Sequence, residues 1–406
     1  MTNESAQNKM SWMHHGRSKV GWATAIVAAG LVFLGTPTAV GQTSRGGKAK
    51  TLYSFTGGND GGSPYAGLIR DAQGNLYGAT FYGGTANLGA VFKVDQKGRE
   101  TVLYSFTGKP DGEHPSSDLL IDSAGNLYGA AYEGGANGYG AVFKVSKHGK
   151  ERVLYSFTPG SDGEYPGSGL IQDASGNLYG TTGYGGVSGN GTVFKISKSG
   201  KEKILHSFTG SDGQYPFCTL LMDGSGNFYG TTSSGGDFGF GTVFRLSHNG
   251  KVKSLHSFAD GTDGANPYSG LVQDQQGNFY GTTYYGGAGC QGYDCGTVFK
   301  ITARGKETVL HAFGLYDGHY PDFGTLALNA AGNLYGTTYA GGQGDMGVVF
   351  KVNSNSGKEN IVYTFTGGPD EGFPVAGLVQ DASGNLYGTT LGNPPSSNGT
   401  VFRIKP

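Results

Sequence analysis

The sequence predicts an all-β protein, a seven-bladed β-propeller built from four-stranded blades. The first observation is a decapeptide, "DASGNLYGTT" at residues 173–182, which has six near copies along the chain. The copies begin at Asp71, Asp122, Asp223, Asp274, Asn329 and Asp381. The second observation is their spacing, since the glycine before each "N(L/F)YG" recurs every 50 to 55 residues. A fixed period of about 50 residues is typical of propellers, solenoids and repeat arrays.

One repeat, residues 166–208, divides into four short segments separated by turn residues. The segments are "SGLIQD" (168–173), "NLYGTT" (177–182), "GTVFKIS" (191–197) and "EKILHSF" (202–208). In the first turn, Asp173 can hydrogen-bond the backbone and Gly176 can adopt a left-handed conformation. No segment shows a sustained helical period of apolar residues. Four strands in a unit of this length predict one propeller blade.

The two ends of the chain predict a closed ring. The last repeat stops after "GTVFRIKP" and lacks its fourth strand, whereas "GKAKTLYSF" at residues 47–55 aligns with "GKEKILHSF" at residues 200–208. Each end supplies what the other lacks, so residues 47–55 are expected to complete the last blade. An open solenoid would need polar caps instead, and closure removes an exposed sheet edge.

Residues 1–41 are predicted to be a secretory signal peptide, which leaves residues 42–406 as the propeller. The basic stretch "HHGRSK" (14–19) precedes an apolar run (20–35) and a small-residue stretch that ends near Gly41. The alternative is a membrane anchor, but the run is shorter than the roughly 20 apolar residues that span a bilayer. The mature protein is therefore expected to be secreted or extracytoplasmic, without a membrane span.

Charge and cysteine content narrow the classes of partner. The net charge is −1 and no long charge run occurs, which argues against nucleic acid and against an anionic membrane surface. In an exported protein Cys290 and Cys295 are expected to form a disulfide. A zinc site is the alternative, but two thiolates without a nearby histidine lack the usual four ligands. We expect no metal and no cofactor.

The repeated blocks "GNLYG", "GTVF" and "LYSF" resemble the Gloeo/Verruco (GloVer) tandem-repeat family of exported bacterial proteins. The resemblance covers nearly all of residues 47–406. It implies an exported repeat protein, and it brings no established activity and no catalytic motif. Members of that family carry varied C-terminal anchors or sorting signals, whereas this chain ends at Pro406 after a strand, so no anchor is expected. More loosely, "GLIQDASGNLYG" is similar to the inner hairpin of NHL-type propellers, which are mostly binding platforms.

Two kinds of loop are expected on one face of the ring, those between blades and those between second and third strands. The between-blade loops share an Asp and a Pro, as in "DGEYP" (162–166). A residue needed in every blade is interpreted as shaping the turn. Calcium binding is the alternative for this Asp, but one carboxylate per loop falls short of the roughly six oxygens that the ion needs.

Binding is expected to use the side chains that vary on this face. The candidates are Tyr165, Tyr215 and Tyr320 before prolines, the loop aromatics Tyr139, Phe240 and Tyr293, and the acids Asp118 and Glu133. Aromatic rings beside carboxylates suit sugars, whose C–H faces stack on rings while their hydroxyls bond polar groups. The alternative is that these rings pack over the blade ends.

Other departures from the repeat are interpreted as structural. Asp118 replaces a residue that is mostly Gly in other blades, and Arg70 is a second charge near the axis. Both are expected to be solvated there. A column of histidines and a lone cysteine in a column of small residues are expected to be buried or packed. They are His206, His256, His311 and Cys218.

The functional hypothesis is a non-catalytic binding or scaffold module, acting as a monomer toward polysaccharides or cell-surface glycans. The first alternative is a carbohydrate-active hydrolase or lyase, for which two facing carboxylates would be needed; Asp118 and Glu133 are the candidates. The second alternative is a structural or adhesive platform that binds proteins. The sequence contains no Ser-His-Asp order, metal-spaced His pair or Gly-x-Ser-x-Gly elbow.

Overall fold

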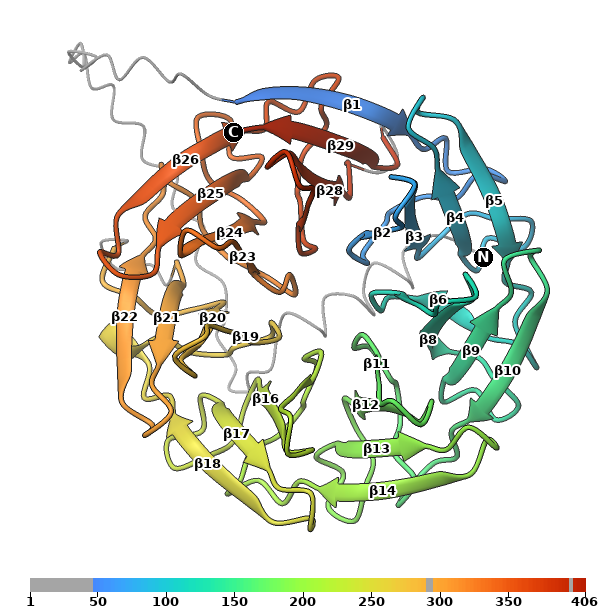
Figure 1. The fold of residues 1–406 in the computed structure, drawn as a ribbon, viewed down its shortest axis with the longest axis horizontal. Coiled ribbons are helices and arrows are strands. Elements are labelled where there is room, and N and C mark those ends of the chain that lie inside the picture. Colours follow the sequence, from blue (N-terminus) through green and yellow to red (C-terminus); the bar gives the residue numbers. More distant parts are fainter. Residues whose placement is uncertain (1–46, 290–294, 394–396) are drawn as a thin grey trace, which may run out of the picture. The chain divides into compact units, whose positions relative to one another are not determined.

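The computed structural model describes residues 47–289, 295–393 and 397–406, and these form a ring of seven β-sheets around one axis (Figure 1). The predicted all-β, seven-bladed propeller is confirmed. The predicted signal peptide, Tyr293 and Cys290 lie outside the described residues, so export and the Cys290–Cys295 disulfide stay predictions. Among the described residues there is no helix with the length and apolar character to cross a bilayer.

Each blade contains four antiparallel strands that follow one another outward from the axis in sequence order, except that the outermost strand of the last blade is the first strand of the chain. The innermost strands are β2 (Ile69–Arg70), β7 (Leu120–Ile121), β11 (Ile171–Gln172), β15 (Leu221–Met222), β19 (Val272–Gln273), β23 (Ala327–Leu328) and β27 (Val379–Gln380). The second strands are β3 (Leu76–Thr80), β8 (Leu127–Glu133), β12 (Leu178–Thr182), β16 (Phe228–Thr232), β20 (Phe279–Thr283), β24 (Asn333–Thr338) and β28 (Leu386–Thr390).

The outer half of each blade is more extended. The third strands are β4 (Ala90–Val94), β9 (Ala141–Val145), β13 (Thr192–Ile196), β17 (Thr242–Leu246), β21 (Thr297–Ile301), β25 (Val348–Asn353) and β29 (Thr400–Lys405). The outermost strands are β5 (Glu100–Ser105), β10 (Glu151–Ser156), β14 (Glu202–Ser207), β18 (Val252–Ser257), β22 (Glu307–Ala312), β26 (Glu359–Thr364) and β1 (Lys48–Ser54). The second blade adds a short strand, β6 (Glu113–Pro115), beside β8.

Ring closure occurs as predicted, because the first strand pairs with the last. The sheet order is β1-β29-β28-β27, and Lys50 pairs with Arg403. The register of β1 on β29 repeats that of β14 on β13, including an irregularity at the equivalent position in both pairs. The alignment of residues 47–55 with residues 200–208 is thus reproduced in space.

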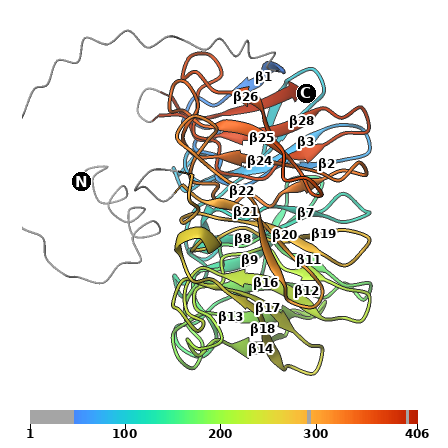
Figure 2. The same ribbon diagram turned by 90° about the vertical axis from the view of Figure 1, so that its left-hand side faces the viewer.

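The repeated decapeptide forms the inner hairpin of each blade. Asp173 accepts hydrogen bonds from the amides of Ser175 and Asn177, from the Asn177 side chain and from the Tyr179 hydroxyl. Gly176 takes the left-handed φ of +83° that this turn requires. Figure 2 shows these hairpins extending from one side of the ring, opposite the short helix η1 (Gly261–Asp263) of a between-blade loop.

The innermost strands are shorter than predicted. The segment 168–173 was expected to be a strand, but only Ile171 and Gln172 pair with β12. The reason lies in the neighbouring blade: the Gly169 amide donates to the Thr219 hydroxyl at 3.0 Å and so is not available to a strand partner. Near the axis, contacts between blades replace contacts within a blade.

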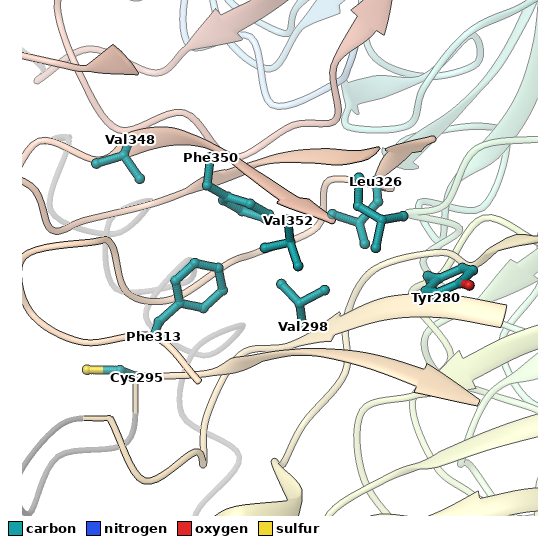
Figure 3. Packing of buried hydrophobic residues seen from close by; sticks show 9 residues of the cluster. Tyr280, Cys295, Val298, Phe313, Leu326, Val348, Phe350 and Val352 are labelled. Atoms are coloured by element: carbon teal, nitrogen blue, oxygen red, sulfur yellow. The ribbon is translucent and has the colours of Figure 1, made fainter. Parts of the chain in front are cut away.

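The core lies between adjacent blades. Figure 3 shows one such cluster, in which Val298 and Phe313 of the fifth blade meet Phe350 and Leu326 of the sixth. Within each blade a phenylalanine of the third strand covers a glycine of the second. A Cβ at Gly180 would stand only 2.8 Å from Phe194 Cζ, and therefore the "YG" of the decapeptide requires glycine.

Candidate functional site

The two predicted kinds of loop meet on one face of the ring, which we call the loop face. Glu164 of a between-blade loop bridges to Tyr184, two residues after β12. The Tyr165 amide donates to the Tyr139 carbonyl in the preceding blade at 3.0 Å. The loop face is therefore held together both within each blade and across each blade boundary.

The recurring aspartate of the between-blade loop shapes the turn, as interpreted from the sequence. Asp162 accepts hydrogen bonds from the Thr158 amide and hydroxyl, at 2.7 and 2.9 Å, and from the Tyr155 hydroxyl at 2.7 Å. Its oxygens are thus engaged by the protein itself.

The histidine column has a role that the sequence analysis did not anticipate. His206 packs edge-on against Phe208, in agreement with the expected packing role. Its Nε2 also lies 2.8 Å from Asp212 Oδ2, the between-blade aspartate that follows it. His256 and His311 make the equivalent contacts with Asp263 and Asp317. Histidine and tyrosine therefore alternate in this column because both can donate a hydrogen bond to the aspartate.

The residue before each between-blade proline adopts a left-handed backbone conformation. The seven φ values lie between +51° and +60°, a region that non-glycine residues rarely occupy. The residues are Ser63, His114, Tyr165, Tyr215, Asn266, Tyr320 and Phe373. We call them the pre-proline column. All three tyrosines predicted before prolines as binding residues belong to it.

Hydrogen bonds on both sides hold this strained backbone in place. At Tyr215 the amide donates to Asn190 of the preceding blade, and the carbonyl accepts from Ser233 of its own blade. The same pair of bonds recurs at Tyr320, with Cys295 and Tyr339. Strained conformations persist only where the surroundings over-determine them. Each side chain of the column is consequently presented on the loop face from a fixed backbone.

Aromatic rings form a continuous belt on the loop face. Neighbouring ring centroids in the belt lie 4.9 to 6.4 Å apart. In order, the aromatic belt is Tyr132, Tyr165, Tyr184, Phe217, Tyr268, Tyr284 and Tyr320. Its members come from both kinds of loop and span five blades.

The loop-specific aromatic candidates turn inward more than expected of contact residues. Tyr139 and Phe240 are half-buried and pack against the apolar clusters between blades. Tyr139 also meets the ring of Tyr165 edge-on at 5.9 Å. Phe238, two residues before Phe240, is instead 60% exposed. Packing thus accounts for most of the surface of Tyr139 and Phe240.

Asp118 joins two blades near the axis. Its Oδ1 accepts a hydrogen bond of 2.6 Å from the Gly67 amide, as Thr219 does for Gly169. Burial raises the pKa of Asp118, and the bond from Gly67 offsets part of that rise. Asp118 was expected to be solvated, but its side chain is half-buried. Arg70, the other expected solvated charge, lies over the Tyr387 ring at 5.9 Å.

Asp322 is a buried acid that the sequence analysis missed. Its side chain is 3% exposed, and neither carboxylate oxygen has a hydrogen-bond partner of acceptable geometry among the described residues. Burial raises its pKa well above the usual range, and burial, with a smaller contribution from the Asp322 charge, raises the pKa values of Tyr65 and Tyr339. The sequence does mark this position as exceptional, because the segment between Pro321 and Leu326 is one residue longer than the equivalent segment of the other blades.

Glu133 lies in a cluster with two further residues that the sequence analysis did not single out. It is the cross-strand partner of Glu113, and its Oε2 lies 3.4 Å from Nδ1 of His114. All three side chains are half-buried. Asp118, its predicted catalytic companion, is engaged instead by Gly67. The arrangement offers one imidazole and two carboxylates at one point of the loop face.

The comparison with known families agrees with the repeat. The family described as the Gloeobacter/Verrucomicrobia repeat matches residues 28–239 and 219–406. No curated protein matches the sequence.

Solved structures show a similar fold at low sequence identity. The extracellular domain of a protein described as a hybrid two-component system of B. thetaiotaomicron has a TM-score of 0.58 and 10% identity. That likeness covers 87% of this chain but 39% of the other protein, so this chain spans about two fifths of its length. A gluconolactonase of Xanthomonas campestris has a TM-score of 0.46 and 14% identity, covering 88% and 89% of the two chains. At 10% identity the first likeness concerns the fold alone.

Proposed function

The chain belongs to the Gloeobacter/Verrucomicrobia repeat family, and from that premise we propose that it is an exported, non-catalytic propeller that binds polysaccharide or cell-surface glycans through its loop face. The family identifies a repeat architecture and no reaction. The case for binding therefore comes from the side chains that differ between blades.

The pre-proline column carries the proposal. Tyr165, Tyr215 and Tyr320 are half-buried, and their backbone is fixed by hydrogen bonds on both sides. A group that is already fixed loses little conformational freedom on binding, so more of its contact energy remains as affinity. Tyrosine offers an apolar ring face together with a hydroxyl, which suits the mixed C–H and hydroxyl surface of a sugar.

The arrangement of the belt favours an extended ligand over a small one. Rings from five blades follow one another around the face, and Tyr165 and Tyr320 lie near its two ends. Tyr268 and Tyr284 are buried and support their neighbours, so contact at the partly exposed rings on either side of them adds small contributions along a chain-like ligand. A polysaccharide is such a ligand.

The test is depletion of the purified protein by insoluble cellulose, chitin and xylan, with released sugars measured in parallel. Tyr165→Asn and Tyr215→Asn remove rings while keeping a residue that tolerates the left-handed conformation, since Asn266 occupies the same column. We expect each substitution to weaken retention about five- to tenfold. Tyr179→Phe, in the inner hairpin on the opposite side, is the matched control and should bind like the native protein.

Each outcome decides between the hypotheses. Retention without sugar release, lost in the column variants, supports a glycan-binding face. Release of sugars would assign the protein to the hydrolase or lyase class. Absence of both retention and release on all three polymers would refute the glycan proposal.

A further inference from the structure

The second blade differs from the other blades at one cross-strand pair of the loop face. Elsewhere the pair holds at most one carboxylate, as in Gly62–Tyr82, Glu164–Tyr184, Gln214–Ser234, Ala265–Tyr285 and His319–Ala340. In the second blade Glu113 stands opposite Glu133. Like charges directly opposite each other destabilise a strand pair. A pair of glutamates that no other of these pairs contains points to a positive charge bound between them.

His114 supplies a third ligand atom with suitable geometry. Ligand atoms of Glu113, His114 and Glu133 all lie within 4.8 Å of one another. The distance from His114 Nδ1 to Glu133 Oε2 is 3.4 Å. Two ligands about 2.1 Å from a tetrahedral ion are themselves about 3.4 Å apart. The His114–Glu133 edge therefore already has the spacing of a coordinated metal, and the Glu113 ligand atom lies within 4.8 Å of both.

The three side chains stand on a rigid base. Glu113 and His114 lie in β6, the strand present in this blade beyond the four-strand pattern. The His114 ring stacks on Phe81 at 4.6 Å and meets Tyr82 edge-on at 5.5 Å. Its amide donates to the Leu88 carbonyl of the preceding blade. The imidazole is consequently oriented before any ion arrives, which favours metal binding.

A second cluster of similar composition does not carry the same conclusion. His311, Asp317 and Glu359 also bring ligand atoms within 4.8 Å. However, Tyr155, Asp162 and Glu202 occupy the equivalent positions in an earlier pair of blades, and there the hydroxyl donates to the aspartate. The His311 cluster is therefore a variant of a contact between blades, whereas the Glu113 cluster has no such counterpart.

We propose that Glu113, His114 and Glu133 form a binding site for a divalent cation of the Zn²⁺ class. One imidazole and two carboxylates suit such borderline ions, while calcium would take oxygen ligands alone. Three protein ligands leave at least one coordination position for water or for an oxygen of a bound molecule. The site is independent of the glycan proposal.

The test measures Zn²⁺ binding to the purified protein, prepared without a polyhistidine tag and stripped with a chelator. Stoichiometry is determined by elemental analysis after dialysis, and affinity by titration calorimetry. Glu113→Gln and His114→Tyr remove one ligand each; tyrosine is the residue of the same column in three other blades. We expect one bound equivalent in the native protein and at least about tenfold weaker binding in either variant.

Two variants serve as matched controls. Glu164→Gln changes the residue equivalent to Glu113 in the next blade, and His311→Tyr changes the other cluster to the common form of its column. Both should bind Zn²⁺ like the native protein. Zinc should also raise the melting temperature of the native protein and of the controls but not of His114→Tyr.

Three results would overturn the proposal. The first is that the native protein takes up no zinc. The second is that the controls lose as much zinc affinity as the ligand variants, and the third is that both ligand variants keep the native zinc affinity. If His114→Tyr fails to fold, Glu113→Gln still decides, because it preserves the size of the side chain. A simple ion pair between His114 and Glu133 would give the first of these results.

Discussion

Asp322 shows how one residue can act against the stability of the fold. It is 3% exposed, and among the described residues its carboxylate oxygens have no hydrogen-bond partner of acceptable geometry. Burial raises its pKa well above that of an exposed aspartate. Asp322 therefore contributes most to the free energy of unfolding below its unfolded pKa of about 4. This contribution is lost as the pH rises through its higher folded pKa.

Asp322→Asn should stabilise the protein at pH 8 by about 1–3 kcal/mol, because it removes a buried charge that costs more to desolvate than a neutral polar group does. The amide keeps the size of the side chain but carries no charge. Near pH 4 the two proteins should melt at similar temperatures. Thermal denaturation at both pH values checks this, with the exposed Asp237→Asn as control. A lower melting temperature of Asp322→Asn at pH 8 would mean that the charge is stabilised in the fold.

At the residue scale, the recurring positions could be predicted from the sequence and the exceptional ones could not. The role of Asp173 in the hairpin turn follows from its own neighbours in the chain. The Glu113–His114–Glu133 cluster depends on a cross-strand register that brings two different loops together. Both loops depart from the repeat in the same blade, and that shared departure is the feature of the sequence that could have indicated the cluster. Tyr139 and Phe240 needed packing information, which a loop sequence does not contain.

The outermost strands carry a repeated element that responds to pH. In five blades the strand opens with a glutamate whose buried Oε1 has no hydrogen-bond partner in the described part of the chain, and burial raises its pKa to about 7. In all five, the aspartate of the preceding between-blade loop raises the pKa further, and at Glu307 and Glu359 a histidine of the preceding blade opposes this rise. These glutamates are Glu100, Glu151, Glu202, Glu307 and Glu359.

The melting temperature should fall as the pH rises from 5 to 8. A glutamate with a folded pKa of about 7 and an unfolded pKa of about 4.3 stabilises the fold fully below pH 4. That stabilisation is lost progressively up to pH 7. Glu151→Gln should make the melting temperature depend less steeply on pH. Measuring the same substitution in the Asp322→Asn protein separates the contribution of the glutamate from that of Asp322. A native melting temperature that is constant from pH 5 to 8 would refute the shift.

At the element scale, turns and strands were predictable where contacts are local. The second, third and fourth strands of the repeat agree with their predicted segments to within one residue at each end. The innermost strand was wrong because Gly169 bonds to another blade. The histidine column was incompletely understood for the same reason, since its aspartate partner lies in the loop that leads to the next blade.

For the whole molecule, the ring could be predicted because the last repeat lacks its fourth strand and the N-terminal segment supplies it. Only a closed ring brings these two segments together. Lys50 opposite Arg403 repeats the pairing of Lys203 with Lys195. The function could not be predicted in the same way. Seven equivalent blades share what builds the ring, so the function depends on side chains that differ between blades.

The closure itself can be tested by moving it to another blade. A circular permutant that starts at Gly200 and ends at Ser199 would place the chain ends in the third blade, with Pro406 joined to Gly47 through one serine. The joined segment then has the length of the native turn between β13 and β14. Because β1 on β29 has the register of β14 on β13, we expect the permutant to fold with a melting temperature within a few degrees of the native protein.

Deletion of residues 1–55 should have the opposite effect. It exposes the edge of β29 and removes Phe55, which is 4% exposed and packs between the first and last blades. An unpaired edge favours association with other chains, so we expect loss of the cooperative transition and aggregation. Deletion of residues 1–46 leaves β1 intact and is the matched control. A chain without residues 1–55 that melts cooperatively as a monomer would show that the ring does not depend on its closing strand.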